Sequence, residues 1–118
     1  MPHTSTKKRI LWLTWKDASN PLAGGAEVVA SEIGKRLVAD GHEVTFLVGG
    51  YTGAKHEDTK DGYRIIRVGG RFSVYYRAYQ YYTKHFKHDD FDIVIEEVNT
   101  IPFFSQFYIN SRRVLFFH

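Results

Sequence analysis

Short apolar runs of the kind found in strands alternate along this chain with longer segments whose apolar residues recur at helical spacing. Five runs predict strands; they cover residues 10–15, 44–48, 63–68, 91–95 and 114–117. Two longer segments between them carry an apolar residue every three or four positions, which is typical of a helix with one buried face. Strands that alternate with helices favour a parallel sheet with helices on both faces. The alternation therefore predicts an α/β fold.

The first predicted helix begins after Gly24-Gly25 and ends at Asp40, where Gly41 suits the left-handed residue that closes a helix. Its apolar side is formed by Ala26, Val29, Ala30, Ile33 and Leu37. The second predicted helix covers residues 72–88. Its aromatic side is formed by Phe72, Tyr75, Tyr76, Tyr79, Tyr82 and Phe86.

The predicted order of elements is β-α-β-β-α-β-α-β, in which the last helix is short. Asn99 or Thr100 caps this helix, and Pro102 lies in its first turn. The connection between the second and third strands, residues 51–61, is polar and is expected to be a loop. This order predicts a Rossmann-like parallel sheet with strand order 3-2-1-4-5, with the third strand at its edge in either direction.

Ligands of an open parallel sheet bind beyond the carboxyl ends of the strands, where the strand order reverses. That point lies between the first and fourth predicted strands, so residues 15–27, residues 96–102 and His118 are expected to converge there. His118 is placed to donate to a bound hydroxyl or to act near a reacting centre, although a lone histidine is more often structural. Glu96 and Glu97 face opposite ways. One is expected to point into the cleft and the other to be solvated.

Gly24 and Gly25 directly precede the first predicted helix. Such a turn lets a ligand approach the backbone, and the free N–H groups and the helix dipole attract an anion. The alternative is that the glycines only shape the turn. Glu27, in the first turn of the helix, complements the helix dipole or accepts hydrogen bonds from sugar or polyol hydroxyls. Both alternatives remain open for each residue.

Several ligand classes are disfavoured by missing motifs. There is no G-x-G-x-x-G, and Gly49-Gly50 follow the second strand where a ribose-binding carboxylate is expected, which disfavours nicotinamide and flavin cofactors. No Gly-Lys-Ser/Thr follows the glycines, so a P-loop is absent too. The chain has no cysteine, which excludes disulfides and thiolate metal sites. His85, His88, Asp89 and Asp90 look only superficially like a metal site.

The net charge is mild at +3, from 16 Lys and Arg against 13 Asp and Glu. One domain, residues 9–118, is expected after a flexible basic lead, residues 1–8. No apolar run approaches the roughly 18–20 residues of a membrane span, and we expect a cytoplasmic protein. The second predicted helix combines its aromatic residues with basic ones, namely Arg71, Arg77, Lys84 and Lys87. These residues either pack on the sheet or contact an anionic acceptor or the inner membrane surface. No nucleic-acid-binding module is present.

Several stretches of the sequence carry a family likeness. They are the strand of residues 10–14, Pro21-Leu22-Ala23-Gly24-Gly25-Ala26-Glu27 after it, the helix end and strand of residues 37–47, the stretch of residues 92–104 that begins Asp92-Ile93-Val94-Ile95-Glu96-Glu97-Val98, and Val114-Leu115-Phe116-Phe117 running into His118. With these stretches the chain, from residue 9 to 118, resembles the N-terminal domain of glycosyltransferase family four. Members are retaining transferases with two domains, arranged in the GT-B fold.

This resemblance implies transfer of a sugar, of the hexosyltransferase type, from a nucleotide-sugar to an acceptor hydroxyl with retained configuration. No metal or other cofactor is expected. Gly24 and Gly25 would cover the donor diphosphate, and His118 would match the strand-end catalytic histidine near the transferred sugar. Glu27 and Arg71 would lie on the acceptor side.

The second Rossmann-like domain of such enzymes, which binds the nucleotide, is missing from the sequence. The N-terminal domain also ends at its fifth strand. The isolated chain is therefore expected to transfer no sugar at a useful rate. It would be a fragment or one half of a split enzyme, with the missing domain in cis or in trans. The alternative is a non-catalytic Rossmann-like module or a subunit that completes a partner's active site.

Overall fold

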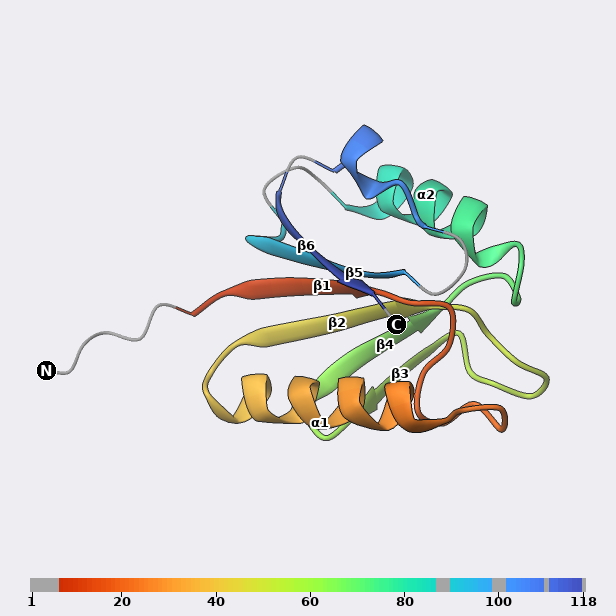
Figure 1. Cartoon of the computed structure of the whole chain (residues 1–118), viewed down its shortest axis with the longest axis horizontal. Helices are drawn as coiled ribbons and strands as arrows, with labels where there is room; N and C mark the ends of the chain where they lie inside the picture. Colours follow the sequence, from red (N-terminus) through yellow and green to blue (C-terminus); the bar gives the residue numbers. More distant parts are fainter. Residues whose placement is uncertain (1–6, 87–89, 99–101, 110, 118) are drawn as a thin grey trace, which may run out of the picture.

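A computed structural model describes residues 7–86, 90–98, 102–109 and 111–117 of the chain. Its strands are β1 (Arg9–Leu13), β2 (Glu43–Val48), β3 (Glu57–Lys60), β4 (Tyr63–Arg67), β5 (Ile93–Val98) and β6 (Arg112–Phe117). The helices are α1 (Gly25–Ala39), α2 (Val74–His85) and the short 3₁₀ helix η1 (Ser105–Phe107). Figure 1 shows one sheet with α1 on one face and α2 with η1 on the other.

The strands form a single sheet in the order β3-β4-β2-β1-β5-β6. The five predicted strands are β1, β2, β4, β5 and β6, and they lie parallel in the predicted relative order. This arrangement confirms a Rossmann-like α/β fold with helices on both faces. The prediction was wrong at one edge, because β3 adds a sixth strand that pairs antiparallel with β4. The third predicted strand is therefore internal to the sheet.

The expected loop of residues 51–61 contains β3, which joins β4 through Asp61 and Gly62. Both turn residues have positive φ, 50° for Asp61 and 87° for Gly62. Two consecutive residues of positive φ form the tight turn that suits the twist of a hairpin. The strand itself, Glu57–Lys60, has no buried residue and so lacks the apolar alternation that marks a strand in a sequence.

The two faces of the sheet form two apolar cores, because side chains alternate along each strand. From β1, Leu11 and Leu13 face the core under α2, and Ile10 and Trp12 face the core under α1. No helix in the described part of the chain is long and apolar enough to cross a membrane.

The buried side of α1 differs from the predicted one. Ala30 is buried as predicted and Leu37 packs against the core, but Val29 and Ile33 are exposed, and Glu27 and Gly34 are buried in their place. A Cβ on Gly34 would lie 2.9 Å from the Phe46 ring. The absence of a side chain at Gly34 thus lets the helix approach the sheet closely. Apolar spacing alone does not reveal a contact made by a glycine.

Two other helices were predicted too long or in the wrong place. The second begins at Val74, so Phe72 lies before it and is exposed, and residues 87–89 are outside the described part. Pro102 is not helical, and the only regular turn described in this region is η1. Asn99 and Thr100, its expected caps, also lie outside the described residues.

Candidate functional site

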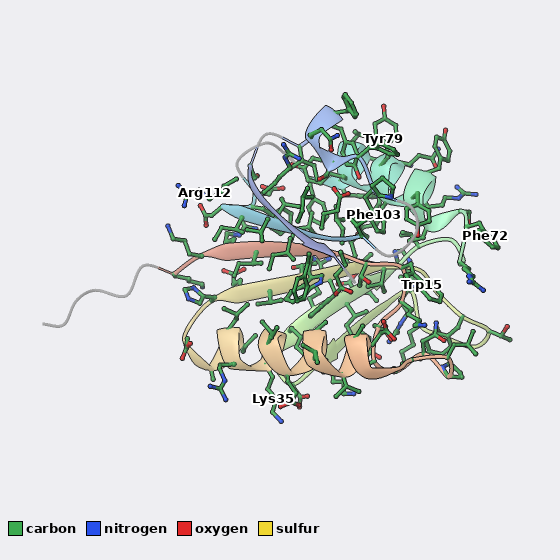
Figure 2. The ribbon with its side chains drawn as sticks, viewed as in Figure 1. Trp15, Lys35, Phe72, Tyr79, Phe103 and Arg112 are labelled. Atoms are coloured by element: carbon green, nitrogen blue, oxygen red, sulfur yellow. The ribbon has the colours of Figure 1, made fainter. Side chains whose placement is uncertain are left out.

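The carboxyl ends of β1, β2 and β4 meet at one end of the molecule, where the chain leaves β1 through Trp15. The Gly49 N–H donates to the Trp15 carbonyl oxygen with an N···O distance of 3.0 Å. A Cβ on Gly49 would lie 2.5 Å from that same oxygen, so the contact requires glycine. Figure 2 shows Trp15 and Phe72 at this end of the molecule and Arg112 at the opposite end.

Helix α1 begins at the same end with two glycines that the fold does not require. Neither has a φ in the left-handed region, and a Cβ would lie 3.9 Å from Glu27 Oε1 at Gly24 and meet nothing within 4 Å at Gly25. The Gly24 N–H donates to Glu27 Oε1 at 2.7 Å. The exposed Gly25 has no acceptor for its N–H among the described residues. The Gly25 amide is thus open to an anion at the helix start.

Glu27 is a buried carboxylate, 5% exposed, in the first turn of α1. Its Oε1 accepts from the Gly24 N–H and lies 3.6 Å from Lys16 Nζ. Within the described chain, Oε2 of Glu27 makes no hydrogen bond. The residue therefore positions the glycine turn and neutralises Lys16, and one oxygen is left for another donor.

Two cationic side chains stack on Trp15. Lys16 Nζ lies 3.8 Å from the centroid of the Trp15 ring, and the Arg71 guanidinium carbon lies 5.2 Å from it. Arg71 forms no ion pair with any described carboxylate, whereas Lys16 is paired with Glu27. Arg71 thus supplies positive charge that no described carboxylate neutralises, on the Trp15 ring that it shares with Lys16. The predicted site residues Gly24, Gly25, Glu27 and Arg71 are connected through Lys16 and Trp15, two residues whose roles the sequence did not reveal.

The loop between β1 and α1 is tied to β4 by a buried ion pair. Arg67 Nε lies 2.7 Å from Asp17 Oδ2, and both side chains are at most 5% exposed. The same guanidinium stacks on Tyr51, and its Nη2 has no hydrogen-bond partner in the described structure. An open hollow of about 450 Å³ lies beside Arg67 and is lined also by Tyr51, Lys55 and His56. Nothing local in the sequence pairs Asp17 with Arg67, which is 50 residues away.

Glu96 and Glu97 do face opposite sides of β5, but the prediction that one is solvated was wrong. Each is 1% exposed. Glu97 accepts from Trp12 Nε1 at 2.6 Å, on the α1 side. Glu96 accepts from the N–H groups of Phe103 and Ser105 and from the Ser105 hydroxyl, on the α2 side. Both carboxylates are buried because each has donors that replace water.

His118 lies outside the described residues, so its predicted catalytic position stays a prediction. The strand before it, β6, pairs Phe117 with Val98 at the carboxyl end of β5. Of the four residues that look only superficially like a metal site, His88 and Asp89 also lie outside the description. Among described residues, no three His, Cys, Asp or Glu side chains are grouped to hold a metal ion.

The parallel sheet, its reversal of order beside β1 and the open helix start at its carboxyl end define a Rossmann-like domain. A family model described as Glycosyltransferase Family 4 matches residues 23–118, a stretch that begins just before the glycine turn. The chain belongs to glycosyltransferase family 4, and this membership supports a transferase. Comparison with curated proteins gives no match.

Proposed function

We propose that the chain is the acceptor-side part of a retaining glycosyltransferase of GT-B fold, which moves a sugar from a nucleotide-sugar to an acceptor hydroxyl. The observation that carries the proposal is the start of α1. Neither Gly24 nor Gly25 is required by backbone conformation or by packing within the chain. A glycine that the fold does not need is explained by a ligand that approaches the backbone closely.

The donor diphosphate would be bound by the Gly25 N–H, the positive end of the α1 dipole and Arg71. Negative charge grows on the diphosphate as the bond to the sugar breaks. Fixed donors aimed at it stabilise that charge without reorganisation of solvent. Lys16 contributes less, because Glu27 neutralises it. Its role is to position Glu27 and the glycine turn.

The acceptor would lie in the hollow beside Arg67, which is also lined by Gly70, the residue before Arg71. Tyr51 and His56 offer stacking and hydrogen-bonding groups there. Glu27 lies outside this hollow and lines a small cavity with Thr14 and Tyr63. By family resemblance, His118 would act beside the transferred sugar. No step of this scheme needs a metal ion or another cofactor.

Transfer would also need a nucleotide-binding domain, supplied in cis or in trans. Donors on one side of the diphosphate give only part of the charge stabilisation that the reaction requires. We therefore expect the 118-residue chain alone to bind diphosphate weakly and to transfer no sugar at a useful rate. Clear turnover by the isolated chain with a range of nucleotide-sugars would contradict this expectation.

The diphosphate site is tested by NMR titration of the ¹⁵N-labelled chain with inorganic pyrophosphate and then with nucleoside diphosphate sugars. We expect the amide signal of Gly25 to shift progressively, and the amides of the last turn of α1 to stay in place. Arg71→Gln should weaken the titration several-fold. The matched control Lys35→Gln, at an exposed position of α1, should not change it. An unmoved Gly25 signal at about 20 mM pyrophosphate, far above a typical substrate KM, would refute the site.

The alternative, a non-catalytic subunit that completes a partner's active site, predicts the same diphosphate binding. The enzyme and the split assembly differ in where the second domain is encoded. A second α/β domain encoded downstream in the same frame favours the enzyme, and one in an adjacent frame favours the split assembly.

A further inference from the structure

Exposed aromatic side chains gather on the α2 side of the molecule. Phe72, Tyr76, Tyr79, Phe104 and Phe107 are between 44% and 78% exposed, and we call them the aromatic face. Tyr79 stacks edge-on against Tyr108, the residue after η1, at 5.1 Å between ring centroids. This contact joins α2 to η1, which lie together above the sheet in Figure 1. The large apolar side chains exposed on the described part of α1 are aliphatic: Val28, Val29 and Ile33.

The described segments that form the aromatic face carry only positive charges. Residues 70–86 and 102–109 contain no Asp or Glu, and they include Arg71, Arg77 and Lys84. None of the three cations forms an ion pair with a described residue. Arg77, Lys84 and His85 also line an open hollow of about 260 Å³. Free cations around a hollow of this kind suit a phosphate group.

Backbone strain at Phe104 gives a second, independent observation. Phe104 has φ 56° and ψ 37°, the left-handed conformation that a bulky side chain rarely adopts. The buried Glu96 carboxylate fixes this conformation, because it accepts from the N–H groups on both sides of Phe104, those of Phe103 and Ser105. The Phe104 ring is then half-exposed rather than packed. Strain that directs an aromatic ring into solvent indicates a surface that meets another partner.

We propose that the aromatic face and its free cations dock on an anionic lipid bilayer. Aromatic rings that sit at the headgroup level, together with cations that meet lipid phosphates, are what this interface favours. A fluid bilayer also accommodates rings spread over α2, η1 and the loop before α2 without one concave groove. The face reaches Arg71 and Phe72 at the end where Trp15 lies (Figure 2). Docking would thus bring the candidate site to the membrane surface, and it does not depend on the proposed sugar transfer.

Vesicle flotation tests the proposal with the whole chain. Vesicles of phosphatidylcholine with 30% phosphatidylserine and vesicles of phosphatidylcholine alone would be compared; neither headgroup carries an alcohol hydroxyl that could accept a sugar. We expect the chain to float with the anionic vesicles and to dissociate from them in about 0.5 M salt. Arg77→Gln with Lys84→Gln should weaken binding by about 25-fold, since each such charge near an anionic surface is worth about 1 kcal/mol. Phe72→Ser with Phe107→Ser should weaken it by at least about tenfold.

Control variants on α1 test whether binding depends on the aromatic face itself or on exposed charge and apolar surface in general. One control variant, Lys35→Gln with Arg36→Gln, removes two exposed cations from α1. A second, Val28→Ser with Val29→Ser, removes two exposed apolar side chains from the same helix. Both variants should float like the parent chain. Urea unfolding confirms that each variant is folded. Equal binding to neutral vesicles, no flotation of the parent chain, or equal losses in the α1 variants would overturn the proposal. The proposal would also be overturned if the parent chain were a dimer in gel filtration and the variant Phe72→Ser with Phe107→Ser were a monomer, because the aromatic face would then join two copies.

Discussion

Gly25 and Gly49 lie near the same end of the sheet, and the chain itself requires only Gly49. A Cβ at Gly49 would lie 2.5 Å from the Trp15 carbonyl oxygen, whereas one at Gly25 meets nothing within 4 Å. Gly49→Ala should therefore lower the free energy of unfolding by about 1–3 kcal/mol, the usual cost of overpacking. Gly25→Ala should leave it unchanged or raise it by up to about 1 kcal/mol, because alanine favours a helix. Urea denaturation of the two variants measures both.

The Gly25 result bears on the candidate site as well as on stability. A loss of more than about 1 kcal/mol in Gly25→Ala would show that the glycine has a structural role, and the argument for a ligand there would fail. Without such a loss, weaker pyrophosphate binding by the same variant can be assigned to the ligand.

Phe104 stores strain that a comparison of two substitutions can measure. Phe104→Ala and Phe104→Gly remove the same ring, but only glycine adopts the left-handed conformation without steric cost. We expect Phe104→Gly to be more stable than Phe104→Ala by about 1 kcal/mol in urea denaturation, although glycine is usually the less stable of the two. Equal stabilities would mean that the turn relaxes and that Glu96 does not impose the conformation.

At the scale of elements, the Asp17–Arg67 pair connects the β1–α1 loop to β4. Asp17→Ala leaves Asp58 as the one described carboxylate near the buried Arg67 guanidinium; its Oδ2 lies 3.6 Å from Arg67 Nη1, and its side chain is partly exposed. Arg67 Nη1 also donates to the Lys55 carbonyl oxygen at 3.1 Å. Loss of one partner of a buried pair typically costs about 3–5 kcal/mol, and we expect a value near the lower end. Chemical denaturation measures the cost. A loss below about 1 kcal/mol would show that Asp58 and water replace Asp17.

The β3–β4 hairpin predicts a small dependence of stability on acid. A hydrogen bond from Arg64 lowers the pKa of Glu57 below its ordinary value of 4.5. The folded chain thus keeps Glu57 ionised where the unfolded chain binds a proton, so the stabilisation is complete above about pH 5 and is lost as pH falls through the lowered pKa.

Glu57→Gln isolates this contribution, because the other carboxylates titrate in both proteins. Between pH 6 and pH 3 the free energy of unfolding should fall by up to about 0.5 kcal/mol more in the parent chain than in the variant, because an exposed ion pair contributes about this much. Parallel stability curves would show that the hairpin pair contributes nothing in solution.

The same elements show how far the sequence predicts this fold. Buried runs such as those of β1 and β2 are apolar at nearly every position, and their order follows from the alternation with helices. β3 was missed because all its residues are polar, although Asp61-Gly62 is a recognised hairpin signal. The orientation of α1 was missed because its closest contact is made by Gly34.

The candidate site was predicted only in part, for a related reason. Gly24, Gly25 and Glu27 are neighbours in sequence at a recognisable helix start. The contacts of Arg71 with Trp15 and of Arg67 with Asp17 join residues about 50 positions apart, and periodicity says nothing about such pairs. Glu96 and Glu97 were misjudged because their donors, among them Trp12 Nε1 and the Ser105 hydroxyl, come from other elements.

At the scale of the whole molecule, β6 lies at one edge of the sheet, where no other described strand pairs with it. Val114 and Leu115, on opposite faces of this strand, are each 47% exposed, and Arg112 and Arg113 beside them are exposed as well. Charged residues on an edge strand oppose pairing with a second chain. Arg112→Gln with Arg113→Gln should therefore increase association at high concentration, as measured by light scattering. Lys35→Gln with Arg36→Gln, which removes the same charge from α1, should not; equal scattering would exclude β6 as the cause.

The placement of the two tryptophans gives the molecule an optical reporter of its own. Trp12 is buried and hydrogen-bonded to Glu97, so its emission should stay constant when a small anion is added. Trp15 is partly buried between Lys16 and Arg71, and cations this close to an indole alter its fluorescence. If Arg71 turns toward a bound diphosphate, the emission of Trp15 changes, and occupancy at the start of α1 can be followed without a label.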